Sequence, residues 1–172
     1  MHPGRHVRHA GLDDLATIRA NYAFARQQMA ANGNPTQWGD TYPLESTVID
    51  DITRHRMMLL VDDEDGHERV LAQFAACTGP DPSYATIEGA WLDDDEYAAL
   101  HRIASAGVGA HSARDCLGWM LQTYGNVRAD THANNRVMQH ILESAGFARC
   151  GLITLCDRDH DAQRIAYQRH DR

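Results

Sequence analysis

The stretch THANNRVMQHILESAGF, Thr131 to Phe147, carries the strongest helix signals in the chain. Its apolar residues recur at the spacing of an amphipathic helix with one buried face, and they are Val137, Met138, Ile141, Leu142 and Ala145. Asn134 is the predicted N-cap, because its side-chain oxygen can accept from a free amide of the first turn. Gly146 suits the left-handed position after the last turn. A second cap would be redundant, so Asn135 is left as a candidate binding residue.

Strands and helices alternate on both sides of this helix. The pattern predicts one further helix, which begins directly after the glycine-bearing turn AGVGAHSA and ends near residue 124. Strands are expected over 97–105, 126–131, 148–155 and 163–168. Alternation of this kind favours parallel pairing of strands in the second half of the chain.

The first half of the chain reads differently. We expect a short strand, a long helix, a loop rich in turn residues, a second helix and a hairpin of two strands, over residues 6–10, 12–32, 32–43, 44–54, 57–61 and 70–77 in that order. Residues 84–92 are expected to form a further strand. The prediction is an α/β fold with a mixed central β-sheet flanked by helices, as a single domain over 1–172, with about 1–4 and 170–172 disordered.

Charge and composition exclude several kinds of function. The net charge is −8, from 24 acidic and 16 basic residues, so the overall field does not attract nucleic acid or an anionic membrane surface. All 16 basic residues are arginine. The absence of lysine removes a Walker-type phosphate lysine, a Schiff-base lysine and a Ser-Lys catalytic pair.

The cysteines and histidines give no metal motif. The four cysteines stand far apart, so we expect buried free thiols and a reducing compartment. Eleven histidines form no metal-binding spacing, and no metal site is predicted. No stretch approaches the roughly 18 apolar residues of a membrane span, and we expect a cytoplasmic protein without membrane contact.

The two strand-turn-helix segments resemble the signature motifs of the GCN5-related N-acetyltransferases (GNAT family). The first is the strand ending near Ser105 with GVGAHSA and its helix, and the second is Asn135-x-x-Met138 with Ile141-Leu142 and Gly146-Phe147. Helix N-termini can hold a diphosphate without lysine. The resemblance implies a GNAT-like fold, acetyl-CoA as co-substrate and a set of residues that contact it, namely Ile103, Ala104, Ser105, Val108, Gly109, Ala110, His111, Ser112, Ala113 and Asn135.

The chain departs from the family pattern at two places. The family's phosphate loop reads Gln/Arg-x-x-Gly-x-Gly/Ala, whereas the best-placed register here runs from Val108 through His111 to Ala113, and only the last position matches. A shifted register, from Ala106 through Gly109 to His111, keeps only the central glycine. Leu142 stands where many members have a tyrosine that protonates the departing thiolate. Tyr167 or His132 could replace it, or water, since a free thiol has a pKa of ~8.5.

Acetyl transfer to an amine needs a base. An amine of pKa ~10.4 is almost entirely protonated at pH 7, a deficit of roughly 4.6 kcal/mol. Glu88 is the first candidate, because an acidic residue within an apolar strand is costly to bury without a purpose; a glutamate at a strand edge or facing outward would explain it equally well. His101 is the second. The resemblance also implies that backbone amides near Ile103 and Ser105 hold the pantetheine arm and polarise the thioester.

The acceptor is predicted only as a class. Trp38, Tyr42, Trp91 and Glu88 could form a pocket for an amine, although core packing is the better explanation of each aromatic residue taken singly. The negative net charge slightly favours a polyamine-like or peptide amine. We therefore expect an acetyltransferase acting on a small-molecule or peptide amine by direct attack in a ternary complex, with a homodimer possible in this family. The alternative is a noncatalytic module that binds acyl-CoA or another small ligand; a hydrolase using Cys150 or Ser112 lacks a paired base at motif spacing.

Overall fold

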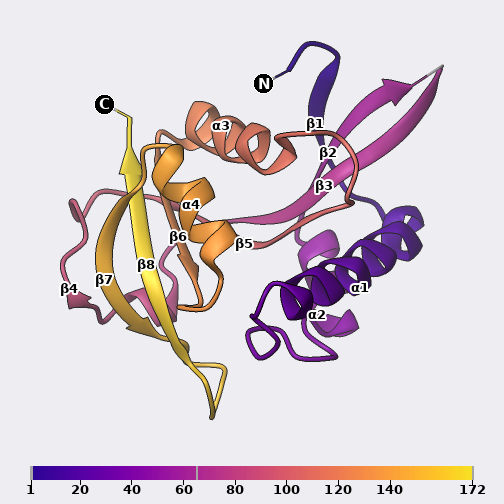
Figure 1. The fold of residues 1–172 in the computed structure, drawn as a ribbon. Coiled ribbons are helices and arrows are strands. Elements are labelled where there is room, and N and C mark those ends of the chain that lie inside the picture. Colours follow the sequence, from indigo (N-terminus) through magenta and orange to yellow (C-terminus); the bar gives the residue numbers. More distant parts are fainter. Residues whose placement is uncertain (1, 65, 172) are drawn as a thin grey trace.

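The centre of the computed structural model, which describes residues 2–64 and 66–171, is an eight-stranded sheet (Figure 1). In spatial order its strands are β1 (Arg5–His9), β2 (Met57–Glu64), β3 (His67–Thr78), β5 (Ala98–Ser105), β6 (Asn126–Thr131), β8 (Gln163–His170), β7 (Ala148–Thr154) and β4 (Glu88–Gly89). The helices are α1 (Leu15–Ala31), α2 (Glu45–Thr53), α3 (Ser112–Tyr124) and α4 (Arg136–Ser144), with short 3₁₀ turns η1 (Leu12–Asp14) and η2 (Pro82–Tyr84).

Only β5 and β6 pair in parallel among the described strands, so the predicted mixed sheet is confirmed but its predicted parallel half is not. A parallel pair needs a crossover, and α3 provides it between β5 and β6. After α4 the chain forms β7, but β8 then returns antiparallel and takes the place beside β6.

The two larger of three apolar clusters among the described residues lie on opposite faces of the sheet, and a smaller one contains Tyr84. Alternation along a strand sends successive side chains to opposite faces, and β2 illustrates this: Met58 and Leu60 join the core under α3 and α4, whereas Met57, Leu59 and Val61 join the core under α1 and α2. Figure 1 shows α3 and α4 together on one part of the sheet and α1 with α2 on another. The expected stripe of α4 is confirmed by Leu142, which is fully buried.

The expected strand over residues 84–92 is wrong. Its first residue, Tyr84, is the last residue of η2, whose N-cap Asp81 accepts from the amide of Ser83. Of the expected strand, only Glu88 and Gly89 pair with β7 at the edge of the sheet. Tyr84 turns inward and its hydroxyl donates to Asp130, while the Trp91 indole donates back to the Tyr84 carbonyl. These contacts fold the segment over the sheet.

The two ends of the described chain are bonded to the fold. The His2 amide donates to Asp115 of α3, and His170 is the last residue of β8, opposite Asn126. These residues belong to the ends that the sequence predicted to be disordered; Met1 and Arg172 lie outside the described residues. Within the described part, no helix has the length and apolar character needed to cross a membrane.

Candidate active site

A cavity of about 590 Å³ opens where β5 separates from β6. The two strands pair only from Ala98 to Leu100 of β5, although β5 continues to Ser105. Residues 99–105 of β5 and 129–131 of β6 line the cavity. Because the strands diverge, the end of β5 has backbone groups available to a ligand on this side, and this volume suits an organic ligand.

A second hollow of about 380 Å³ adjoins the cavity at the start of α3. Its lining is formed by the turn before the helix, residues 107–114, with Ser105 and Ile141. Ser105, Ala113 and Ile141 border both spaces. The ten residues that the resemblance implied for the co-substrate therefore lie along one continuous surface.

The turn before α3 has an unusual backbone. Gly107, Gly109 and His111 all have positive φ, and His111 at 63° is the N-cap of the helix. A Cβ on Gly109 would lie 3.0–3.1 Å from Leu71 methyl groups and from an Arg5 nitrogen, so this position requires glycine. The Arg5 guanidinium donates to the Ala110 carbonyl and to Asp115 (both 2.8 Å). Arg5, paired with Asp115, therefore holds the turn in place, and the free amides of the helix N-terminus are the groups that fit a diphosphate.

Asn135, and not Asn134, is the N-cap of α4. Its Oδ1 accepts from the Met138 amide (3.1 Å), and its Nδ2 donates to Gln37 Oε1 (3.0 Å). The Asn134 amide instead donates to the His132 ring. The predicted capping role of Asn134 is therefore wrong, and Asn135 both caps the helix and borders the cavity.

His101 is the best-placed base of the site. Its Nε2 lies 2.8 Å from Asp81 Oδ2, and its Nδ1 lies 3.9 Å from Asp130 Oδ2. All three side chains border the cavity. Burial alone would raise the pKa of the Asp81 carboxyl, but the hydrogen bond and charge of His101 hold it below the usual value. In the neutral tautomer whose Nε2–H donates to Asp81, Nδ1 is the ring nitrogen that can take a proton.

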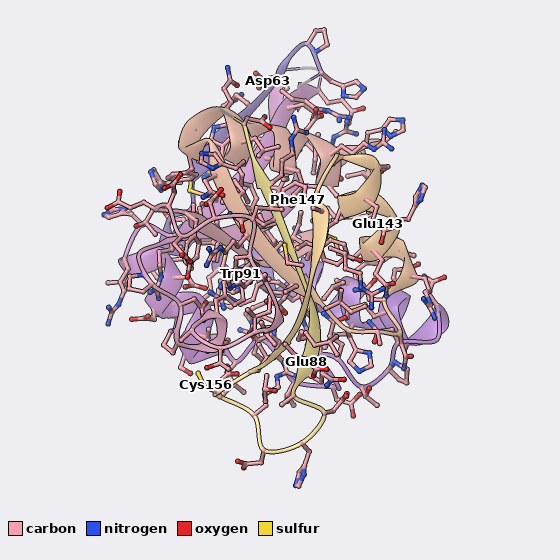
Figure 2. All side chains as sticks on the ribbon, turned by 90° about the vertical axis from the view of Figure 1, so that its left-hand side faces the viewer. Asp63, Glu88, Trp91, Glu143, Phe147 and Cys156 are labelled. Atoms are coloured by element: carbon pink, nitrogen blue, oxygen red, sulfur yellow. The ribbon has the colours of Figure 1, made fainter. Side chains whose placement is uncertain are left out.

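Three predicted residues do not reach the cavity. Glu88 is exposed on the edge strand β4, on the side of the molecule that faces the viewer in Figure 2, so the expectation that it is buried is wrong. Trp91 is half-buried beneath the guanidinium of Arg128. Tyr167 is buried and its hydroxyl donates to Glu143 Oε1 (3.0 Å); burial and Glu143 raise the pKa of Tyr167 to about 12.

Trp38 and Tyr42 border the far end of the cavity as predicted, together with residues that the sequence did not reveal. Arg158 stacks its guanidinium over the Tyr42 ring, 4.5 Å from the centroid. Arg164 of β8 is also part of this wall and is 2% exposed. In the sequence, Arg164 could have been noticed as an arginine at the start of an apolar strand, and Asp81 as the acidic residue of the turn GPDPS.

Other chemically active groups lie elsewhere. Asp93, Asp95 and His170 present ligand atoms within 4.8 Å of one another. Asp93 already accepts from Asn126, Gln168 and His170, so hydrogen bonding at the ends of strands accounts for the cluster. The four cysteines are free, but the expectation that they are all buried is wrong, because Cys156 is exposed; it appears near the lower end of the molecule in Figure 2.

Comparison with solved structures gives the family of this fold and site. A GNAT-family acetyltransferase from Streptococcus agalactiae is 31% identical in sequence, with a TM-score of 0.86, 100% of this chain and 98% of that chain being covered. The chain belongs to the GNAT family of acetyltransferases, and its fold supports acetyl transfer. The resemblance expected from the sequence is confirmed.

More distant structures share the fold. A GNAT-family acetyltransferase from Listeria monocytogenes is 17% identical, with a TM-score of 0.70 and coverage of 96% of this chain and 94% of that one. A phosphinothricin acetyltransferase from Sinorhizobium meliloti, crystallised in complex with AcCoA, is 14% identical, with a TM-score of 0.64 and coverage of 97% and 88%. No family model and no curated protein sequence matches this chain.

Proposed function

We propose that this protein transfers an acetyl group from acetyl-CoA to a primary amine of a small molecule or peptide, by direct attack in a ternary complex. The observation that carries the proposal is that one cavity contains both the diverging end of β5 and the His101–Asp81 pair. A donor held along β5 and an acceptor amine beside His101 would therefore meet without a covalent enzyme intermediate.

The residues of the chain divide the work of binding the donor. The turn before α3 offers its backbone amides to the diphosphate, Arg5 holds this turn through the Ala110 carbonyl, and Asn135 fixes the start of α4 beside it. The end of β5 offers backbone groups to the pantetheine arm and to the carbonyl oxygen. When bound, acetyl-CoA supplies the acetyl group as an activated thioester.

His101 makes the acceptor nucleophilic. Its Nδ1 takes a proton from the ammonium group, and Asp81 stabilises the imidazolium that results. The amine nitrogen then forms the new bond to the acetyl carbon as the bond from that carbon to sulfur breaks. The nitrogen loses its second proton, which passes to the departing sulfur directly or through water, so the products are the amide and free CoA thiol. A thiolate of pKa ~8.5 needs little assistance in leaving, which agrees with Leu142 at the usual tyrosine position and Tyr167 outside the cavity.

The test is the release of free thiol from acetyl-CoA in the presence of a panel of primary amines. His101→Asn should lower kcat by about 10²- to 10⁴-fold at pH 7 because the base is lost, with little change in KM for acetyl-CoA. The exposed His140 of α4 provides the matched control, and His140→Asn should behave as wild type, as should Glu88→Gln.

A noncatalytic module that binds acyl-CoA remains the alternative, because the phosphate loop departs from the family pattern. Binding of acetyl-CoA without thiol release for any amine would favour that module. Full activity of His101→Asn would instead assign the base to another group.

A further inference from the structure

Arg164 is a buried cation without a buried counter-ion. It is 2% exposed, and its Nη1 donates to the carbonyl oxygens of Asp161 and Gln163 (2.6 and 2.8 Å). Its Nη2 is buried and has no hydrogen-bond partner among the described residues. Among the described residues, no carboxylate forms an ion pair with the guanidinium; the two whose charge acts on it, Asp130 and Asp161, lie against His101 and His132. An unpaired buried charge is expensive, so this arrangement indicates a missing partner.

The nearby carboxylates are engaged elsewhere. Asp161 pairs with His132 at 2.8 Å, and Asp130 accepts from the Tyr84 hydroxyl at 2.8 Å. Arg158 is held against the Tyr42 ring and donates to the Gln37 carbonyl. It too has no ion pair within the described residues. The Asp157 carboxylate borders the same cavity but pairs with neither arginine, so two guanidinium groups lie there without a paired anion.

The base and these arginines face the same cavity. Asp130 of β6 lies opposite Ala166 of β8, so Arg164, two residues before Ala166, is a diagonal neighbour on the same face of the sheet, about 7–8 Å away. Asp130 in turn adjoins His101. The cavity therefore has the Asp130 carboxylate and the candidate base His101 at one place, and the positively charged Arg164 a short distance away.

We infer that the acceptor is a small amine that carries a carboxylate, as a free amino acid does, and that Arg164 binds the carboxylate with Arg158 at the rim. This inference rests on the proposed acetyltransferase function and narrows its substrate class. A guanidinium is the donor group best matched to a carboxylate. The negative net charge of the chain slightly favoured a cationic acceptor, but the local charge of a pocket decides what the pocket binds.

The experiment compares each common amino acid with its own carboxamide in the thiol-release assay. The amide has the less basic amine and is more largely uncharged at neutral pH, so reactivity alone favours the amide. We expect wild type to prefer at least one acid over its amide by about 10- to 100-fold in kcat/KM, the usual range for a hydrogen-bonded charge pair. Arg164→Gln should abolish this preference while retaining activity on the amide.

Two variants guard against a loss of folding. Arg164→Lys keeps the positive charge but lacks the paired N–H donors of a guanidinium, so it should retain part of the preference for the acid over its amide. Arg149→Gln, at an exposed arginine on the neighbouring strand β7, should keep the full preference. The ratio of acid to amide is taken within each variant, so a general loss of stability cancels.

The outcomes separate this inference from the proposed function. Acetylation of amides or polyamines with equal or greater efficiency than acids would overturn the inference and leave the acetyltransferase intact. If no amine is acetylated, the melting temperature is measured with CoA and the same amino acids and amides, to test whether the cavity binds a carboxylate. If the acids raise the melting temperature, the amides do not, and Arg164→Gln abolishes the rise, the result supports a carboxylate site without catalysis. If the acids do not raise the melting temperature, the inferred carboxylate site is overturned.

Discussion

Asn135 shows how one side chain serves both the fold and the site. As the N-cap of α4 it accepts from the Met138 amide, and its amide nitrogen reaches Gln37 across the cavity. Asn135→Ala should lower the free energy of unfolding by about 1 kcal/mol, the usual cost of losing a cap, and should also weaken acetyl-CoA binding. Urea unfolding and titration calorimetry measure the two effects.

The control substitutions at this helix are Asn135→Asp and Asn134→Ala. Aspartate keeps the capping oxygen but cannot donate to Gln37, so it should restore most of the stability without the contact to Gln37. Asn134→Ala should leave the stability unchanged. Wild-type stability of Asn135→Ala would contradict the capping role.

His111 occupies a backbone conformation that favours glycine. Its φ of 63° is left-handed, which costs a non-glycine residue roughly 1–3 kcal/mol, most for β-branched side chains. His111→Gly should therefore fold as stably as wild type to within about 1 kcal/mol, since relief of strain offsets the greater freedom of the unfolded chain. His111→Val should be clearly less stable in urea.

His111→Gly also tests how the turn before α3 binds the diphosphate. The backbone amides, and not the imidazole, are expected to bind the diphosphate, so His111→Gly should retain acetyl-CoA affinity to within about threefold. A larger loss of affinity in calorimetry would show that the imidazole itself contacts the diphosphate.

Among the elements, β1, η1 and β3 are joined by Arg8. Its guanidinium makes two hydrogen bonds of 2.8 Å to Asp14 and also binds Glu68. The hydrogen bond from Arg8 is the main cause that lowers the pKa of Asp14. A lowered carboxyl pKa contributes stability above its unfolded value of ~3.9 that is lost as the pH falls through the folded value.

Asp14→Asn should therefore reduce the acid sensitivity of the fold. The difference in melting temperature between pH 7 and pH 3 should be smaller in Asp14→Asn than in wild type. Asp13→Asn, at the exposed neighbouring residue, should keep the wild-type difference. Equal differences in all three proteins would show that the Arg8–Asp14 contact does not contribute to acid unfolding.

At the scale of the whole molecule, the cavity joins segments from both halves of the chain, so a ligand bound there should stabilise the complete fold. At 100 times its Kd a ligand adds ~2.7 kcal/mol, which for this size corresponds to a rise in melting temperature of about 5–10 °C. Acetyl-CoA and CoA should both produce this shift and ATP should not. A shift with ATP, or none with either CoA species, would contradict the proposed donor site.

Much of the architecture follows from the sequence, because it depends on local patterns. The spacing of apolar residues and the glycine after the last turn predicted α4, and the glycine-bearing turn predicted the start of α3. These same local signals carried the resemblance to the family and placed the residues from Ile103 to Ala113 along one surface.

The chemistry of the acceptor side depends instead on contacts between distant segments. Residues 37, 38, 42, 81, 101, 130, 158 and 164 come together only when β8 inserts between β6 and β7 and the loop after α1 reaches the cavity. Glu88 was expected at this site because it stands in an apolar stretch, but Tyr84 and Trp91 of that stretch pack inward and leave it at the edge. Local pattern thus determined the helices, most strands and the candidate donor surface. The tertiary structure decided where the candidate base lies and left Arg164 without an ion pair among the described residues, since burial and charge pairing are properties of neighbours in space.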